Sequence, residues 1–165
     1  TRRLLHIVDV QPIDESDPVA NAQIILNELN KFSQELSQLP QILVLNKIDQ
    51  IPNEQRDAVC QDIITRLGWT GEVFYTSTLT GEGVEAVKHH LMQVIEGERE
   101  RELEDPMFAE AQAARFARLE EEVRHNTEIQ KEAYRAMRKA QREGGDDDDD
   151  WNDDDYDVAV EYAPY

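Results

Sequence analysis

Short, nearly continuous apolar runs alternate in the first part of the chain with stretches in which apolar residues recur every three or four positions. The runs cover residues 4–10, 42–45 and 73–75, and such runs are typical of strands that are covered on both faces. The periodic stretch after each run predicts an amphipathic helix. A strand followed by a helix, three times in succession, predicts an α/β fold with three parallel strands and crossover helices.

Residues with special capping preferences set the expected limits of these helices. Asp17 and Pro18 are of the types favoured at an N-cap and at the first helical position, and Pro40 is expected to end this helix after about five turns. Asn53 is expected to cap the second helix, which Gly68 should end. The apolar positions of the third predicted helix extend from residue 84 to residue 95.

Charge divides the chain into three segments. Residues 1–95 have the balance of an ordinary globular domain, whereas residues 96–143 mix acidic and basic side chains densely and predict a mostly solvated extension of one or two helices. Residues 144–165 hold ten acidic side chains and no basic one, and they account for most of the formal net charge of -19. Because a like-charge run cannot pack, we expect this acidic tail to be disordered.

Composition also argues against several functional classes. A chain this acidic lacks the basic surface of a DNA-binding protein, so no direct DNA binding is expected. No apolar run is long enough to span a membrane, and no signal peptide is visible. The single cysteine, Cys60, should fill the core, and one cysteine without a disulfide fits a reducing, cytoplasmic location.

The sequence Asn46-Lys47-Ile48-Asp49 directly follows the second predicted strand and gives the strongest indication of function. Guanine presents two adjacent donors, its N1–H and its exocyclic amino group, and one ionised carboxylate can accept from both. We assign this role to Asp49, since adenine lacks the donor pair and would be rejected. Asn46 can bridge neighbouring loops through its amide. The stem of Lys47 can lie along the base, with its ammonium left free for a phosphate loop.

A second loop follows the third predicted strand and contains Ser77, Thr78 and Leu79. The Ser77 hydroxyl can hydrogen-bond Asp49 and hold its carboxylate in plane, while the backbone N–H groups of Thr78 and Leu79 can point at guanine O6. A chance polar turn can also produce the Asn-Lys-Ile-Asp pattern. The apolar strand before that motif, the helix after it and the second loop at the right separation together favour a guanine-binding site.

The remaining polar candidates are given structural roles. His6 lies within an apolar strand and is expected to be a core histidine with satisfied hydrogen bonds, whereas Asp9 should cap a loop at the sheet edge. His89 and His90 are adjacent on a helix and face different directions, which argues against a metal site. No residue of the chain is assigned to catalysis or to a metal.

The phosphate-binding half of a nucleotide site has no counterpart in the sequence. The pattern Gly-x-x-x-x-Gly-Lys-Ser/Thr occurs nowhere in the chain, which begins with Thr1 and not with methionine. Together these observations lead us to expect a piece of a longer protein, with the phosphate-binding residues upstream.

Two regions of the chain resemble the Obg family of bacterial GTPases. The first comprises the strand at residues 4–10 and the Pro-Ile-Asp and Asp-Pro-Val sequences that follow it. The second comprises the loops at residues 46–49 and 77–84, which fall where the family has its fourth and fifth guanine-nucleotide motifs. The acidic tail with Trp151 is similar to tails of proteobacterial members. Thr78 departs from the family, which usually has alanine there, and its methyl group can crowd the base.

The resemblance implies that residues 1–95 are the C-terminal half of a P-loop NTPase domain. It also implies GTP and GDP as ligands, slow GTP hydrolysis with rapid nucleotide exchange, and Mg²⁺ as cofactor. The partner it implies is the large ribosomal subunit, in subunit biogenesis and in growth or stress control. The family's phosphate and Mg²⁺ ligands lie upstream of Thr1, so this segment alone should not hydrolyse GTP.

An alternative from a different class is a non-hydrolysing interaction module. In that case the charged extension and the acidic tail bind a basic ribosomal or assembly protein. A phosphate loop encoded upstream of Thr1 would distinguish the GTPase from this module.

Overall fold

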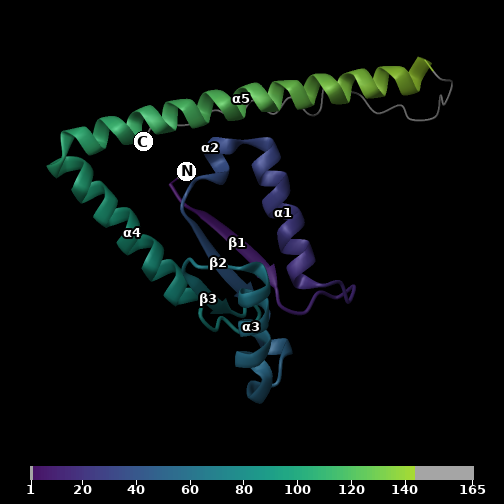
Figure 1. Ribbon diagram of the computed structural model, residues 1–165, viewed down its shortest axis with the longest axis vertical. Coiled ribbons are helices and arrows are strands. Elements are labelled where there is room, and N and C mark those ends of the chain that lie inside the picture. Colours follow the sequence, from purple (N-terminus) through teal and green to yellow (C-terminus); the bar gives the residue numbers. More distant parts are fainter. Residues whose placement is uncertain (1, 144–165) are drawn as a thin grey trace. The chain divides into compact units, whose positions relative to one another are not determined.

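The computed structural model describes residues 2–143 (Figure 1). The chain forms two compact units, Thr1–Asn126 and Thr127–Tyr165. The first unit contains the sheet, and the second is described only over helical residues 127–143. The expected acidic tail, residues 144–165, lies outside the described residues.

The sheet of the first unit has three parallel strands in the order β1-β2-β3 (Figure 1). These strands are β1 (Leu4–Asp9), β2 (Gln41–Asn46) and β3 (Val73–Thr76). Asp9 is the register partner of Asn46, and Asn46 is the partner of Thr76. The predicted three-stranded parallel sheet is therefore confirmed, and all three strands end at the same edge.

The helix expected between β1 and β2 is divided in two, so the prediction of one helix of about five turns is wrong. It consists of α1 (Pro18–Phe32) and α2 (Gln34–Ser37), with Asp17 capping α1 as predicted. Ser33 lies between them in an extended conformation and is buried, and its hydroxyl accepts from the backbone N–H of Leu36. A buried serine that caps a new helix turn interrupts the first helix there.

The helix between β2 and β3 is α3 (Asn53–Leu67), preceded by a single 3-10 turn, η1 (Ile48–Gln50). The expectation that Asn53 caps this helix is wrong, because Pro52 occupies the cap position, and proline has no side-chain group that can cap the first turn. Gly68 ends α3 as predicted, in a left-handed conformation with φ 63°, and its N–H reaches two carbonyl oxygens of the last turn.

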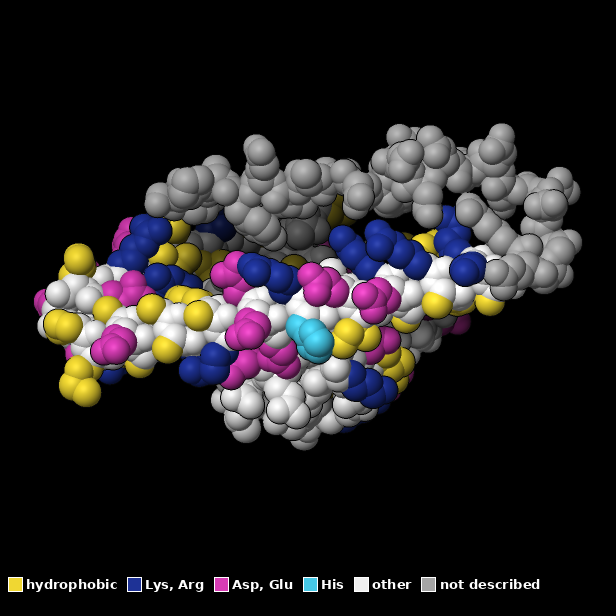
Figure 2. Space-filling model, turned by 90° about the horizontal axis from the view of Figure 1, so that it is seen from above, with side chains coloured by type: hydrophobic (Ala, Val, Ile, Leu, Met, Phe, Trp, Pro, Cys, Tyr) yellow, Lys and Arg dark blue, Asp and Glu magenta, His cyan; other side chains and the backbone are white. Residues whose placement is uncertain are grey.

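The last two helices are α4 (Val84–Glu104) and α5 (Pro106–Glu143). The extension expected over residues 96–143 is thus the second half of α4 followed by a second helix, and α4 runs through residues 95 and 96 without a break. Asp105 separates the two helices and caps α5 by accepting from the N–H groups of Met107 and Phe108. Figure 2 shows acidic and basic side chains interleaved along α5. None of the helices in the described part is apolar enough over a sufficient length to cross a membrane.

The first part of α5 makes specific contacts with α2. The carboxylate of Glu122 accepts from the backbone N–H groups of Gln34 (2.8 Å) and Glu35 (3.0 Å), and these bonds lower the pKa of Glu122. At the other end of α2, the guanidinium of Arg115 donates to the carbonyl oxygen of Gln38 (2.9 Å). Side chains of α5 therefore satisfy backbone groups at both ends of this short helix.

The hydrophobic core lies on the face of the sheet covered by α1 and α3. Its members are buried aliphatic residues of β1, β2, α1 and α3 and of the segments that directly follow β1 and β2, together with Cys60, which is 3% exposed as predicted. Side chains on the other face of β1 are less protected, since Leu5 is 38% and Ile7 56% exposed. The core thus fixes β2 firmly, whereas one side of β1 remains open.

His6 is only partly as expected. It is buried at 7% exposure and stacks on Trp69, with ring centroids 6.1 Å apart. Its Nε2 atom has no hydrogen-bond partner in the part of the chain that the structure describes, so the expectation of a satisfied core histidine is wrong for this nitrogen. Burial lowers the pKa of His6 below its ordinary value of 6.5.

Candidate functional site

The candidate site lies where β2 and β3 end. Asn46, the last residue of β2, is 8% exposed. Its Oδ1 atom accepts from the hydroxyl of Thr76 (3.2 Å) and from the backbone N–H of Thr78 (3.2 Å). Asn46 therefore bridges the two loops, as the sequence predicted. The same bond occupies the Thr78 N–H, which was expected to point at a base.

Lys47 follows in a left-handed conformation, with φ 67° and ψ 34°. Its Nζ atom lies 2.7 Å from Oδ2 of Asp9, at the end of β1. The ammonium was expected to be free, and in the described chain it is paired instead. The sequence assigned Asp9 only a loop-capping role, so the ion pair is a feature that sequence reasoning missed.

Asp49 lies in the η1 turn, and its Oδ1 atom is buried and finds no hydrogen-bond partner among the described residues. A carboxylate oxygen in this state is costly unless something supplies a donor. The predicted bond from Ser77 is not made to this oxygen. Ser77 is fully buried, and its hydroxyl accepts from the backbone N–H of Thr80 (3.1 Å). The hydroxyl thus stabilises its own loop, while Asp49 Oδ1 keeps an unused acceptor.

The loop from Ser77 to Gly83 is closed by its own backbone. The N–H of Ser77 donates to the carbonyl oxygen of Glu82 (2.9 Å), and the N–H of Gly81 donates to that of Ser77 (2.8 Å). The side chain of Leu79 is 85% exposed. Within residues 2–143 its backbone N–H has no hydrogen-bond partner, so it remains available as a donor.

Arg56 ties the two loops together from the first turn of α3. Its Nε–H donates to the carbonyl oxygen of Ile51 (3.2 Å), and its Nη1 lies 3.3 Å from the carboxylate of Glu82. Nothing in the sequence identified this residue, because its partners come together only through the fold. Among the described residues, no group of three or more His, Cys, Asp or Glu side chains is placed to hold a metal ion.

Comparison with known proteins shows which family this sequence resembles. No family model matches the chain. The chain is 66% identical over 139 residues to the GTPase Obg of Psychrobacter sp. (strain PRwf-1). It belongs to the Obg family of GTPases. The aligned region covers 84% of this chain and spans 35% of the length of that relative. The family resemblance stated from the sequence is thereby confirmed.

Proposed function

We propose that this chain forms the guanine-recognising part of the nucleotide site in an Obg-type GTPase. The observation that carries the proposal is the Oδ1 atom of Asp49, which is buried and has no hydrogen-bond partner within residues 2–143. Asp49 lies three residues after Asn46, the residue that bonds to the second loop. A ligand with two adjacent N–H donors would satisfy the Asp49 carboxylate, and guanine has such a pair. The 66% identity to a protein described as a GTPase supports the same assignment.

In the proposed complex, five further residues assist Asp49. Asn46 keeps the two loops at a fixed spacing, and the stem of Lys47 lies along the base. Ser77 and Thr78 keep the second loop folded, and the free N–H of Leu79 donates to guanine O6. This arrangement modifies the sequence-based assignment at Thr78, whose N–H is already bonded to Asn46.

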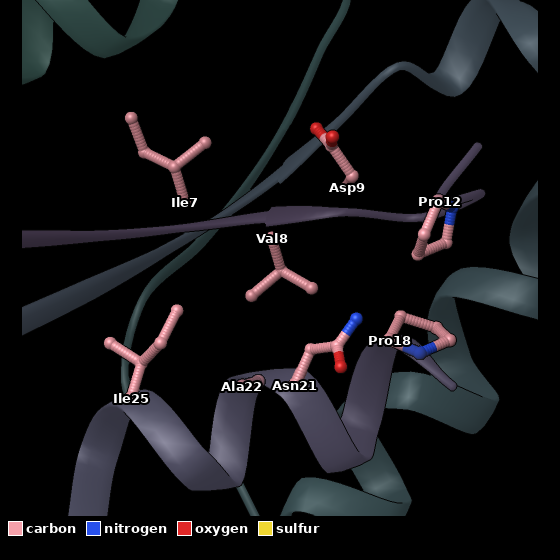
Figure 3. Close-up of a pocket in the computed structure, with 8 residues that line it drawn as sticks. All are labelled: Ile7, Val8, Asp9, Pro12, Pro18, Asn21, Ala22 and Ile25. Carbon is pink, nitrogen blue, oxygen red and sulfur yellow. The ribbon is translucent and has the colours of Figure 1, made fainter. Parts of the chain in front are cut away.

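We further infer that residues 1–95 are the C-terminal half of a P-loop NTPase sheet, followed by the helical extension at 96–143 and the acidic tail at 144–165. Within the described residues β1 pairs with β2 alone, so its other edge is open. Beside it lies a pocket of about 270 Å³ (Figure 3). The pocket is lined by Ile7, Val8, Asp9, Pro12, Pro18, Asn21, Ala22 and Ile25. A further strand paired with β1 would cover both features.

The reaction proposed for the intact protein is slow hydrolysis of GTP by attack of water on the γ-phosphate. Mg²⁺, when bound, would neutralise charge on the phosphates, and its ligands are proposed to lie in the upstream half. The described residues select the base and take no chemical step. As a family member in the cytoplasm, the protein is proposed to act in biogenesis of the large ribosomal subunit.

Competition for a fluorescent GDP analogue on the full-length protein tests this function. GDP should displace the analogue, IDP should do so less well because hypoxanthine lacks the exocyclic amino group, and ADP should fail. Equal displacement by ADP and GDP would contradict guanine recognition. Hydrolysis is followed separately as phosphate release from GTP.

A further inference from the structure

Asp9 contacts both polar residues that begin the candidate base-recognition loop. Its Oδ2 atom lies 2.7 Å from Lys47 Nζ, and its Oδ1 atom accepts from Asn46 Nδ2 at 3.5 Å. Asp9 ends β1 and is the register partner of Asn46 in β2, so the two side chains share one face of the sheet. Figure 3 shows Asp9 and Ile7 on the side of β1 away from α1, opposite to Val8.

The contacts of Asn46 give its amide only one workable orientation. The oxygen accepts from Thr76 Oγ1 and from the Thr78 N–H, so the amino group must face Asp9. Turning the amide over would bring its amino group against the Thr78 N–H and its oxygen against a carboxylate. The negative charge of Asp9 therefore favours the orientation that joins the two loops.

Lys47 provides an independent reason to assign a role to Asp9. A non-glycine residue with positive φ is strained, and such strain persists only where surrounding contacts hold it. The ion pair with Asp9 is such a contact. The side chains of Lys47 and Asp9 are 29% and 38% exposed, so water only partly screens the pair.

We propose that Asp9 is a positioning residue for guanine recognition, acting through Lys47 and Asn46. It fixes the stem of Lys47 along the place proposed for the base, and it orients the Asn46 amide that holds the second loop. The inference rests on the proposed function, but it adds a residue from a third strand to the site.

The test compares Asp9→Ala with Asp14→Asn in the full-length protein, by titration with a fluorescent GDP analogue. Asp14 is an acidic residue of the same β1–α1 connection, and its carboxylate accepts from the backbone N–H and the hydroxyl of Ser16. Loss of a charge-assisted pair at Asp9 should weaken GDP binding about tenfold. The Asp14→Asn protein should bind as the wild type does. Asp9→Glu, which retains the charge, should recover part of the affinity.

Two further readouts separate positioning from general stability. In a Lys47→Met background, Asp9→Ala should lose much less affinity than it does in the wild type, because part of its effect passes through Lys47. NMR signals of the Asn46 side-chain amide and the Thr78 N–H should shift in Asp9→Ala and stay unchanged in Asp14→Asn. Equal affinity losses in both backgrounds, or unmoved signals, would overturn the inference.

Failure of the proposed function would look different. If the wild type bound no guanine nucleotide, the function would be wrong, whatever Asp9 does. The NMR comparison would still report on Asp9, because shifted Asn46 and Thr78 signals support its control of the loops and unshifted signals refute it.

Discussion

Replacing Gly83 by alanine is expected to damage both stability and the candidate site. Gly83 precedes α4 with φ 73°, and a Cβ at this position would lie 2.0 Å from the carbonyl oxygen of Tyr75. Real Cβ contacts stay beyond about 3.0 Å, so the end of β3 would have to move by about 1 Å. That strand end includes Thr76, whose hydroxyl donates to Asn46.

Gly81 offers a matched control for this substitution. It lies in the same loop with φ 82°, but apart from its chain neighbours no atom of residues 2–143 lies within 4 Å of the place that a Cβ would take there. Both alanine variants lose about 1–2 kcal/mol because an L-residue is strained at positive φ. Gly83→Ala should lose about 1–3 kcal/mol more, as overpacked sites do.

Urea unfolding of the two variants and the parent chain measures the difference in stability. GDP titration of the same variants in the full-length protein then tests the effect on the site, which should be larger for Gly83→Ala. Equal free energies of unfolding for the two alanine variants would refute the reasoning, since their only predicted difference is the contact with Tyr75.

Three further predictions follow from the same structure. Residues 1–165 alone should release no phosphate from GTP and should bind GTP poorly, because most of the affinity for GTP should come from phosphate-loop donors and Mg²⁺ outside this chain. Phosphate release from GTP that Asp49→Ala abolishes would refute this prediction. A fragment of residues 1–95 should self-associate through the open edge of β1. This fragment ends within α4 and therefore also lacks Glu98 and Glu102, which form ion pairs with Arg3 and Arg2, respectively. The 1–165 chain should stay in solution but unfold with weak cooperativity, and a monomeric 1–95 fragment with a sharp calorimetric transition would contradict the reasoning. Since burial lowers the pKa of His6, the unfolded chain binds more protons below pH 6.5, so stability should fall as the pH drops from 7 towards 5. His6→Phe should reduce that slope in denaturation curves, and an unchanged slope would exclude His6 as its source.

The parallel sheet could be predicted from sequence because strands buried on both faces leave a plain signature of continuous apolar residues. The break at Ser33 could not, since the apolar period of three and four continues across it through Phe32 and Leu36. Periodicity indicates which face of a helix is buried. The break at Ser33 depends instead on the buried Ser33 hydroxyl, which accepts a hydrogen bond from the backbone N–H of Leu36 in the next turn. The prediction that Asn53 caps α3 is wrong because Pro52, one residue earlier, occupies the cap position.

The candidate site shows a similar division. The sequence located the loops that begin at Asn46 and Ser77, because motif and strand lie next to each other in the chain. The contacts of Lys47 with Asp9 and of Arg56 with Glu82 join residues that only the register of the sheet and the packing of α3 bring together. The unpartnered oxygen of Asp49 is likewise visible only in three dimensions.

The central claim, that Asp49 reads the two donors of guanine, is tested most directly by Asp49→Asn in the full-length protein. An amide presents one donor and one acceptor, which match the edge of xanthine better than that of guanine. In a competition titration of GDP against XDP, the wild type and a control variant of an exposed α3 carboxylate, Asp57→Asn, should prefer GDP. The Asp49→Asn protein should prefer XDP. An unchanged preference for GDP in Asp49→Asn would remove Asp49 from the site and contradict the account.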